Sequence, residues 1–216
     1  MDKHEQHLEN LTEIRSIMDR SSRFISLSGL SGIFAGIFAL SGAAAVYLYF
    51  SSYYYPRYYN QGVYRVSDLI RGGELSEYLL FLLLDGLIVL VLAVSSAMFF
   101  TVRNARKKGN PIWDKTAKRL LTNMFIPLAA GGIFCLILLF HGQIYLIAPA
   151  TLLFYGLALL NAGKYTLNDV RYLGICEIIL GLIASVYIGY GLIFWAIGFG
   201  VLHILYGTIM YYKYER

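Results

Sequence analysis

Long apolar blocks separated by short polar segments make up most of this chain. Each block is roughly 20 residues long, which at about 1.5 Å per residue is enough to cross a hydrocarbon core of about 30 Å. The blocks lack the polar face that a helix of a soluble protein keeps. They predict six membrane-spanning helices, at 24–49, 78–101, 120–140 and 144–162, and in two limbs of 171–214 that are joined by a turn at 189–191.

Two polar segments lie outside the predicted spans and have more than one interpretation. Residues 1–23 have the pattern of an amphipathic helix, with Leu8, Leu11 and Ile14 on its apolar side. This helix lies on the cytoplasmic membrane surface or against the chain's own basic loop, or it docks a protein partner or a second copy of the chain. Residues 50–77 form a tyrosine-rich outer loop, which either anchors the chain at the headgroup interface or caps an outward-facing cavity.

The distribution of basic residues predicts the orientation of the spans. Of the 18 Lys and Arg residues, all but Arg57, Arg65 and Arg71 fall in segments that six crossings place on one side. Because basic residues are enriched on the cytoplasmic side of membranes, both termini are expected in the cytoplasm and the protein in the inner membrane. The loop at 103–119 is the most basic segment, and it is a candidate site for anionic lipid.

Composition narrows the class of protein further. With 58% hydrophobic and 14% charged residues and a mean hydropathy of +0.59, the chain is too apolar for a soluble domain. Long blocks rather than short alternating segments exclude a β-barrel, so the fold class is an all-α membrane bundle with an N-terminal amphipathic helix at 1–23 and a membrane domain at 24–216. The net charge of +5 does not indicate nucleic acid, because the basic residues flank the apolar blocks.

Small residues mark the faces through which the spans pack. The first span carries Gly32 and Gly36 at the spacing that lets helix backbones approach closely in lipid, so it is expected inside the bundle. The fifth span carries Gly174, Glu177, Gly181 and Ser185 on one stripe, and the sixth carries Ala196, Gly200, His203 and Gly207 on another. A tight turn at 189–191 then predicts that the two stripes face each other.

If those stripes meet, Glu177 and His203 lie at the same depth in the membrane. Carboxylates within spans are costly and usually face the protein interior, so both Glu177 and Asp85 are candidate functional residues. The Glu177–His203 pair has two interpretations: a static hydrogen bond that fixes helix register, or a site that holds a proton. Asp85 lies nearer the outer surface, where it is either hydrated or paired with Arg65 or Arg71.

A short phrase recurs in the inward-running spans. It reads Leu-Leu-Asp-Gly at 83–86, Leu-Phe-Tyr-Gly at 153–156 and Ile-Leu-Tyr-Gly at 204–207, which makes Tyr155 and Tyr206 counterparts of Asp85. The outward-running spans share Gly-Ile-Phe at 32–34 and 132–134 and Gly-Ile-Cys at 174–176. The recurrence is that of three related hairpins, although Gly, Leu and Ile are so abundant here that chance competes with this interpretation.

The glycine spacing of residues 173–207, with its turn and its final Tyr-Gly, resembles the HdeD-like family of small six-span bacterial membrane proteins. The resemblance implies a stress-linked protein of the cell envelope without established catalytic residues. The long charged segment at the N-terminus and the tyrosine-rich loop depart from that family's pattern.

No motif of a catalytic or metal site is present. The sequence lacks a phosphate-binding loop, a nucleophile elbow and a zinc-protease motif, and Cys135 and Cys176 have no metal-ligand spacing. We therefore expect no cofactor, no metal and no enzymatic activity. The sequence favours a non-catalytic accessory protein, and the alternative is a small oligomeric proton-coupled transporter or channel with Glu177, His203, Tyr206, Asp85 and Tyr155 as candidate binding residues.

Overall fold

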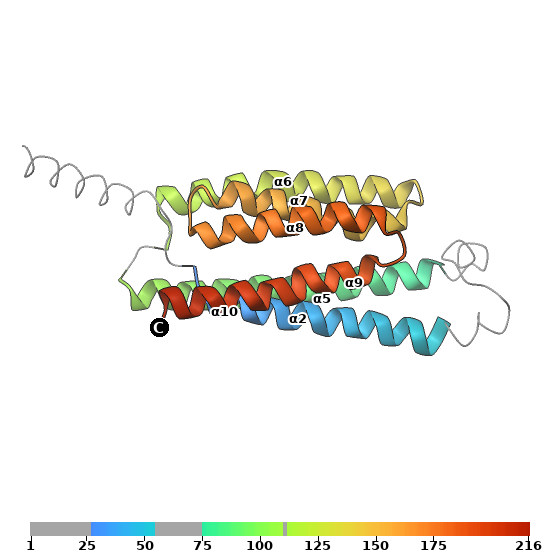
Figure 1. Cartoon of the computed structure of the whole chain (residues 1–216), viewed down its shortest axis with the longest axis horizontal. Helices are drawn as coiled ribbons and strands as arrows, with labels where there is room; N and C mark the ends of the chain where they lie inside the picture. The colour runs from blue at the N-terminus through green and yellow to red at the C-terminus, as the bar shows by residue number, and fades with distance from the viewer. Residues whose placement is uncertain (1–26, 55–74, 110–111) are drawn as a thin grey trace, which may run out of the picture. The chain divides into compact units, whose positions relative to one another are not determined.

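The computed structural model describes residues 27–54, 75–109 and 112–216, and every regular element among them is helical (Figure 1). This confirms the predicted all-α class. The elements are α2 (Gly29–Tyr49), η1 (Phe50–Tyr54), α5 (Leu75–Lys107), α6 (Lys115–Phe140), η2 (Ile144–Leu146), α7 (Ile147–Ala162), α8 (Asn168–Val186), α9 (Gly191–Trp195), η3 (Ala196–Leu202) and α10 (His203–Tyr214). The predicted amphipathic helix at 1–23 and most of the tyrosine-rich loop at 50–77 lie outside the described residues.

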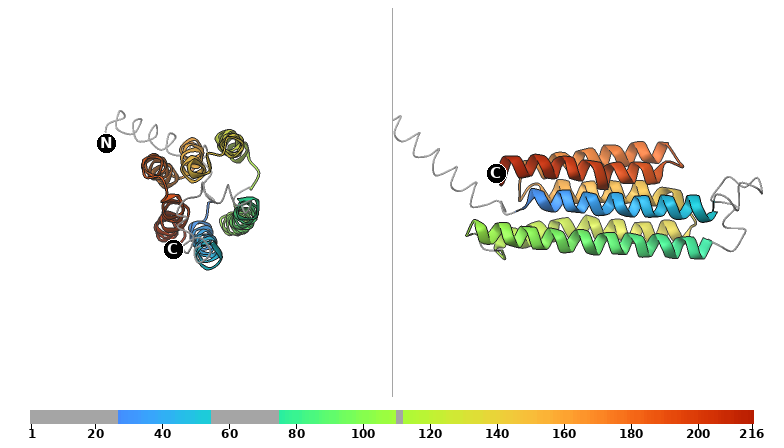
Figure 2. Two further views of the ribbon diagram at one scale, coloured as in Figure 1. Left: turned by 90° about the vertical axis from the view of Figure 1, so that its right-hand side faces the viewer. Right: turned by 90° about the horizontal axis from the view of Figure 1, so that it is seen from below.

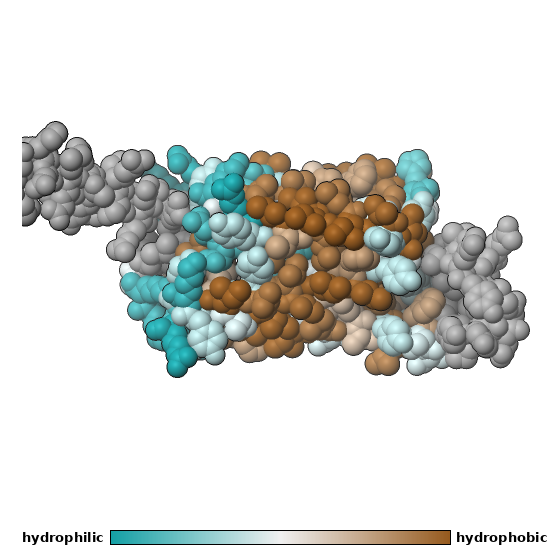
Figure 3. Space-filling view, viewed as in Figure 1, coloured by the Kyte–Doolittle hydropathy of each residue, from teal (hydrophilic) through white to brown (hydrophobic). Residues whose placement is uncertain are grey.

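Within the described ranges, five helical segments are long and apolar enough to cross a membrane. They are Gly29–Ser52, Glu77–Lys107, Lys115–Phe140, Ile144–Ala162 and Gly191–Tyr214. Hydrophobic side chains cover the middle stretches of the helices, and hydrophilic side chains gather towards their ends (Figure 3). Helix α8 is not among the five, because its 19 residues include Asp169, Arg171 and Glu177. The sixth crossing therefore stays a prediction.

The chain divides into two compact units (Figures 1 and 2). Unit 1 contains the described part of Thr101–Val186, with the last turns of α5 followed by α6, α7 and α8. Unit 2 contains the described part of Ser28–Phe100 and all of Tyr187–Arg216. In unit 1, α7 packs against both α6 and α8, and in unit 2, α10 and η3 pack against α2.

Glycines bring α7 and α8 of unit 1 into backbone contact. A Cβ added at Gly156 would lie 2.7 Å from the Gly174 carbonyl oxygen, and one added at Gly174 would lie 2.8 Å from the Gly156 oxygen. Further along the same face, a Cβ at Gly181 would lie 3.0 Å from the Pro149 oxygen. Any larger residue at these positions would force the two helices apart, which is the role small residues have where helices pack in a membrane.

Unit 2 repeats this arrangement between α2 and the η3–α10 segment. A Cβ at Gly207 would lie 2.7 Å from the Gly29 oxygen, one at Gly32 3.1 Å from the Gly207 Cα, and one at Gly36 2.6 Å from the Gly200 oxygen. The close backbone approach expected at Gly32 and Gly36 is present, whereas the position of the first span inside a bundle stays a prediction.

The predicted contact between the glycine stripes of the last two spans is wrong. Gly174 and Gly181 of α8 meet α7, whereas Gly200 and Gly207 of the last span meet α2. The spacing of small residues identifies the face of a helix that packs, but it does not identify the helix that covers this face. The turn itself is present between Val186 and Gly191, with Gly189 at a φ of +101° that favours glycine.

Candidate functional site: a buried carboxylate between α7 and α8

Glu177 lies on the face of α8 that packs against α7. It follows Gly174 by three positions and precedes Gly181 by four, and in a helix such residues share one face. Both glycines touch α7 through their backbones, and the Glu177 side chain has no solvent-exposed surface. The other side of α8 is exposed at Ile175, Ile179 and Leu182. Helix packing therefore removes the carboxylate from the surface of the molecule.

Tyr155 of α7 reaches the same place. It directly precedes Gly156, whose backbone meets Gly174 one helical turn before Glu177. The half-buried Tyr155 side chain interacts electrostatically with the Glu177 carboxylate. Two candidate residues that the sequence indicated separately thus lie together in unit 1. We call this pair the α7–α8 polar site.

His203 belongs to unit 2 and has its own contacts there. Its ring is buried, stacks at 6.0 Å between centroids on Phe199, and its Nδ1 lies 3.0 Å from the Gly198 carbonyl oxygen. A carbonyl only accepts, so Nδ1 is a protonated nitrogen in this contact. Glu177 and His203 fall in different units, and the glycine faces that were expected to join their helices pack on α7 and α2 instead.

The contact between His203 and Gly198 spans a wide turn of the last helix. Residues 196–202 form a π-helix, in which backbone carbonyls bond five positions ahead instead of four. Such segments are rare, and they displace a side chain relative to an unbroken α-helix. Gly200 of this element was predicted only as a packing residue, and the π-helix was not predicted from the sequence.

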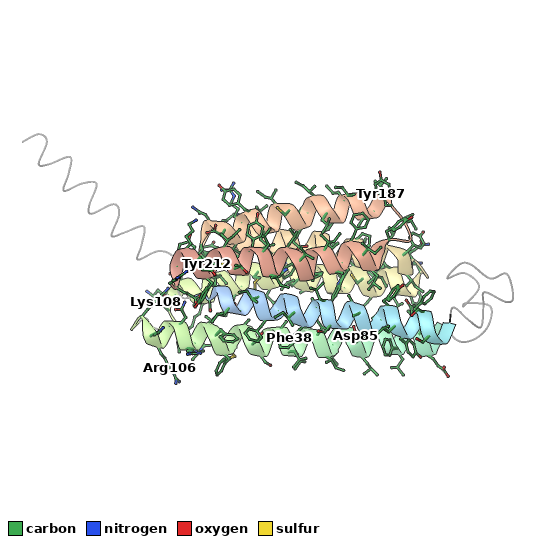
Figure 4. All side chains as sticks on the ribbon, turned by 60° about the horizontal axis from the view of Figure 1, so that its bottom comes forward. Phe38, Asp85, Arg106, Lys108, Tyr187 and Tyr212 are labelled. Carbon is green, nitrogen blue, oxygen red and sulfur yellow. The ribbon has the colours of Figure 1, made fainter. Side chains whose placement is uncertain are left out.

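Asp85 and Tyr206, the remaining candidates, lie in unit 2 and are half-buried. Asp85, labelled in Figure 4, lies on α5. It faces Gly42 of α2, because a Cβ added at Gly42 would lie 3.0 Å from the Asp85 Oδ2 atom. The carboxylate thus occupies space that Gly42 leaves open. Tyr206 precedes Gly207 as Tyr155 precedes Gly156. The predicted partners of Asp85, Arg65 and Arg71, lie outside the described residues.

Sequence reasoning missed a carboxylate at the first turn of α2. Glu215 accepts hydrogen bonds from the Ser28 hydroxyl, at 3.1 Å, and from the Gly29 backbone N–H. Ser28 is a residue type that often precedes a helix, and this was the available signal for the start of α2. Nothing local indicated that its partner follows 187 positions later.

Two further findings concern metal binding and similarity to known proteins. Among the described residues, no group of three or more His, Cys, Asp or Glu side chains is arranged to hold a metal ion. Comparison with known proteins finds no matching family model, no matching curated protein and no matching solved structure. The resemblance to HdeD-like proteins accordingly stays a prediction.

Proposed function

We propose that this chain is a non-catalytic accessory protein of the inner membrane, with six crossings, both termini in the cytoplasm and a stress-linked role in the cell envelope. The observation that favours an accessory role over transport is the burial of Glu177. The stress-linked role derives from the family resemblance alone. Helix α8 serves as the sixth crossing in this proposal, with Glu177 facing α7 and apolar Ile175, Ile179 and Leu182 outward.

The burial of Glu177 distinguishes a structural role of this carboxylate from a role in transport. A residue that passes protons or cations across a membrane must meet water from each side in turn, whereas Glu177 has no exposed surface and is flanked by the backbone contacts of Gly174 and Gly181. In such a place the carboxylate together with Tyr155 fixes how α7 sits along α8, because sliding one helix would separate the two polar groups in an apolar environment.

The test uses purified protein in liposomes that carry a pH gradient. The wild-type chain and the Glu177→Gln variant are both expected to leave proton flux at the level of empty liposomes. Thermal unfolding in detergent supplies the second readout. Glu177→Gln retains a polar group of the same shape, whereas Glu177→Leu removes it, so the Leu variant is expected to unfold at the lower temperature. Glu77→Gln, at the exposed start of α5, is the matched control.

A second candidate function is a small oligomeric proton-coupled transporter or channel. A carboxylate next to a tyrosine within an apolar helix pair is an arrangement that can hold a proton, and this observation favours the candidate. Wild-type flux well above that of empty liposomes, abolished in Glu177→Gln and retained in Glu77→Gln, would establish transport and contradict the accessory function.

A protein partner of an accessory chain is expected at residues 1–23. A variant that lacks residues 1–20 should insert and fold as the full chain does but lose proteins that co-purify in mild detergent. Co-purification that is identical with and without these residues would remove the N-terminal segment from the proposal.

A further inference from the structure

Two groups of basic side chains flank the connection between α5 and α6. Arg103, Arg106 and Lys107 occupy positions i, i+3 and i+4 near the end of α5, and all three are exposed. Lys115, Lys118 and Arg119 repeat this spacing at the start of α6, and they are exposed as well. Residues at this spacing share one face of a helix, so each helix end presents a basic face. Figure 4 shows Arg106 and Lys108 at the end of α5.

The helix ends that carry these side chains are held in place. On α5, Ala105 is fully buried, and the Asn104 side-chain amide donates to the Leu27 carbonyl oxygen at 3.2 Å. Gly109, at a φ of +66°, ends the helix. On α6, the Asp114 carboxylate accepts from the Ala117 backbone N–H at 2.6 Å. The basic side chains therefore extend from ordered helix ends, and the single acidic residue of 103–119 is engaged in the Asp114 cap.

Apolar surface begins immediately beyond the basic residues of α6. Leu121, Phe125 and Ile126 are 41%, 68% and 62% exposed, which is the character of a surface in contact with lipid. Trp113, just before α6, is 63% exposed, and tryptophan is enriched at the boundary between lipid and water. The basic side chains thus lie at the level of lipid headgroups.

We infer that Arg103, Arg106, Lys107, Lys115, Lys118 and Arg119, here named the basic surface, bind the phosphate groups of anionic phospholipids. Phosphate oxygens match the donors of arginine and lysine. Lipid is the occupant because the basic surface borders exposed apolar side chains, which a nucleic acid or a free anion would leave in water. The proposed orientation decides only that these lipids belong to the cytoplasmic leaflet. The inference does not depend on the role of Glu177.

The test compares phosphatidylglycerol with phosphatidylcholine, added to the purified full chain in a neutral detergent. Native mass spectrometry measures lipid binding. The thermal unfolding temperature measures how much the bound lipid stabilises the fold. Phosphatidylglycerol is expected to bind more tightly than phosphatidylcholine and to raise the unfolding temperature. In the variant Lys115→Gln/Lys118→Gln/Arg119→Gln its affinity should fall roughly 100-fold, since each basic residue near an anionic surface contributes about a factor of five.

The matched control removes three exposed charges elsewhere. The variant Lys164→Gln/Arg171→Gln/Arg216→Gln has the same net charge as the first variant, and it should retain most of the affinity for phosphatidylglycerol. The inference is overturned if wild type binds both lipids equally, a comparison that needs no variant to fold. It is also overturned if the two variants lose affinity equally, or if inorganic phosphate alone protects the chain as well as the anionic lipid does.

Discussion

Glu215 holds the first turn of α2 through the Ser28 hydroxyl and the Gly29 N–H. The first N–H groups of a helix have no partner within the helix, and an acidic side chain both accepts from them and matches the positive end of the helix dipole. This is the same chemistry as a local helix cap, supplied here from a segment distant in sequence. It ties α2 to the region that follows α10.

Replacement of this carboxylate should therefore weaken unit 2. We expect Glu215→Gln to lower the free energy of unfolding by about 1 kcal/mol, because a charge-assisted hydrogen bond becomes a neutral one. Unfolding in detergent with increasing denaturant measures the change. Glu77→Gln makes the same replacement at an exposed position of α5. An equal loss of unfolding free energy in both variants would mean that the hydrogen bonds to Ser28 and Gly29 do not stabilise the fold.

At the residue scale, the sequence indicated which polar groups are buried but not what lies beside them. Glu177 was predicted inside the molecule because a carboxylate within an apolar block is costly, and His203 because it shares a stripe with small residues; both are buried. Their partners depend on which helices pack together, and that choice involves residues far apart in the chain. Tyr155 beside Glu177 and Gly198 beside His203 were not predictable from spacing along one helix.

At the scale of helices, the two units use the same contact. Gly156 of a Tyr-Gly step meets Gly174 of a Gly-Ile step in unit 1, and Gly207 and Gly32 do the same in unit 2. These Tyr-Gly and Gly-Ile steps belong to the short segments that recur in the sequence. The helices that pair are consecutive in unit 1, but in unit 2 they are the first and last described helices, so pairing by sequential hairpins alone does not account for the packing.

Methyl groups at the contact glycines should separate the paired helices. Gly174→Ala and Gly207→Ala place a Cβ within 2.8 Å and 2.6 Å of backbone atoms of the partner helix, and each is expected to cost about 1–3 kcal/mol of stability. The measurement is the thermal unfolding temperature in a fixed detergent, which should fall for both variants.

Gly132→Ala is the control for these substitutions, because nothing lies within 4 Å of a Cβ at Gly132. Alanine favours a helix over glycine by up to about 1 kcal/mol, so this variant should unfold at the same or a slightly higher temperature. If all three variants lose stability to the same degree, the loss comes from replacing glycine within a helix and not from a clash with the backbone of the partner helix.

At the scale of the whole molecule, the all-α class and five apolar helices followed directly from the hydrophobic pattern. Long blocks without a polar face leave few alternatives in lipid, since only helices satisfy their own backbone polar groups. Helix α8 is the exception. This helix is less apolar than the others because it contains Asp169, Arg171 and Glu177. Whether it crosses the membrane therefore depends on the shielding of Glu177 by α7 and not on its composition.

The crossing of α8 is the central claim, and the location of its two ends tests it most directly. In a chain with Cys135→Ala and Cys176→Ala, single substitutions Lys164→Cys and Tyr190→Cys place a thiol at exposed positions before and after α8. A membrane-impermeant maleimide applied to intact cells should label Tyr190→Cys, and it should label Lys164→Cys only after the membrane is opened. Labelling of both positions from the same side would contradict the six-crossing account.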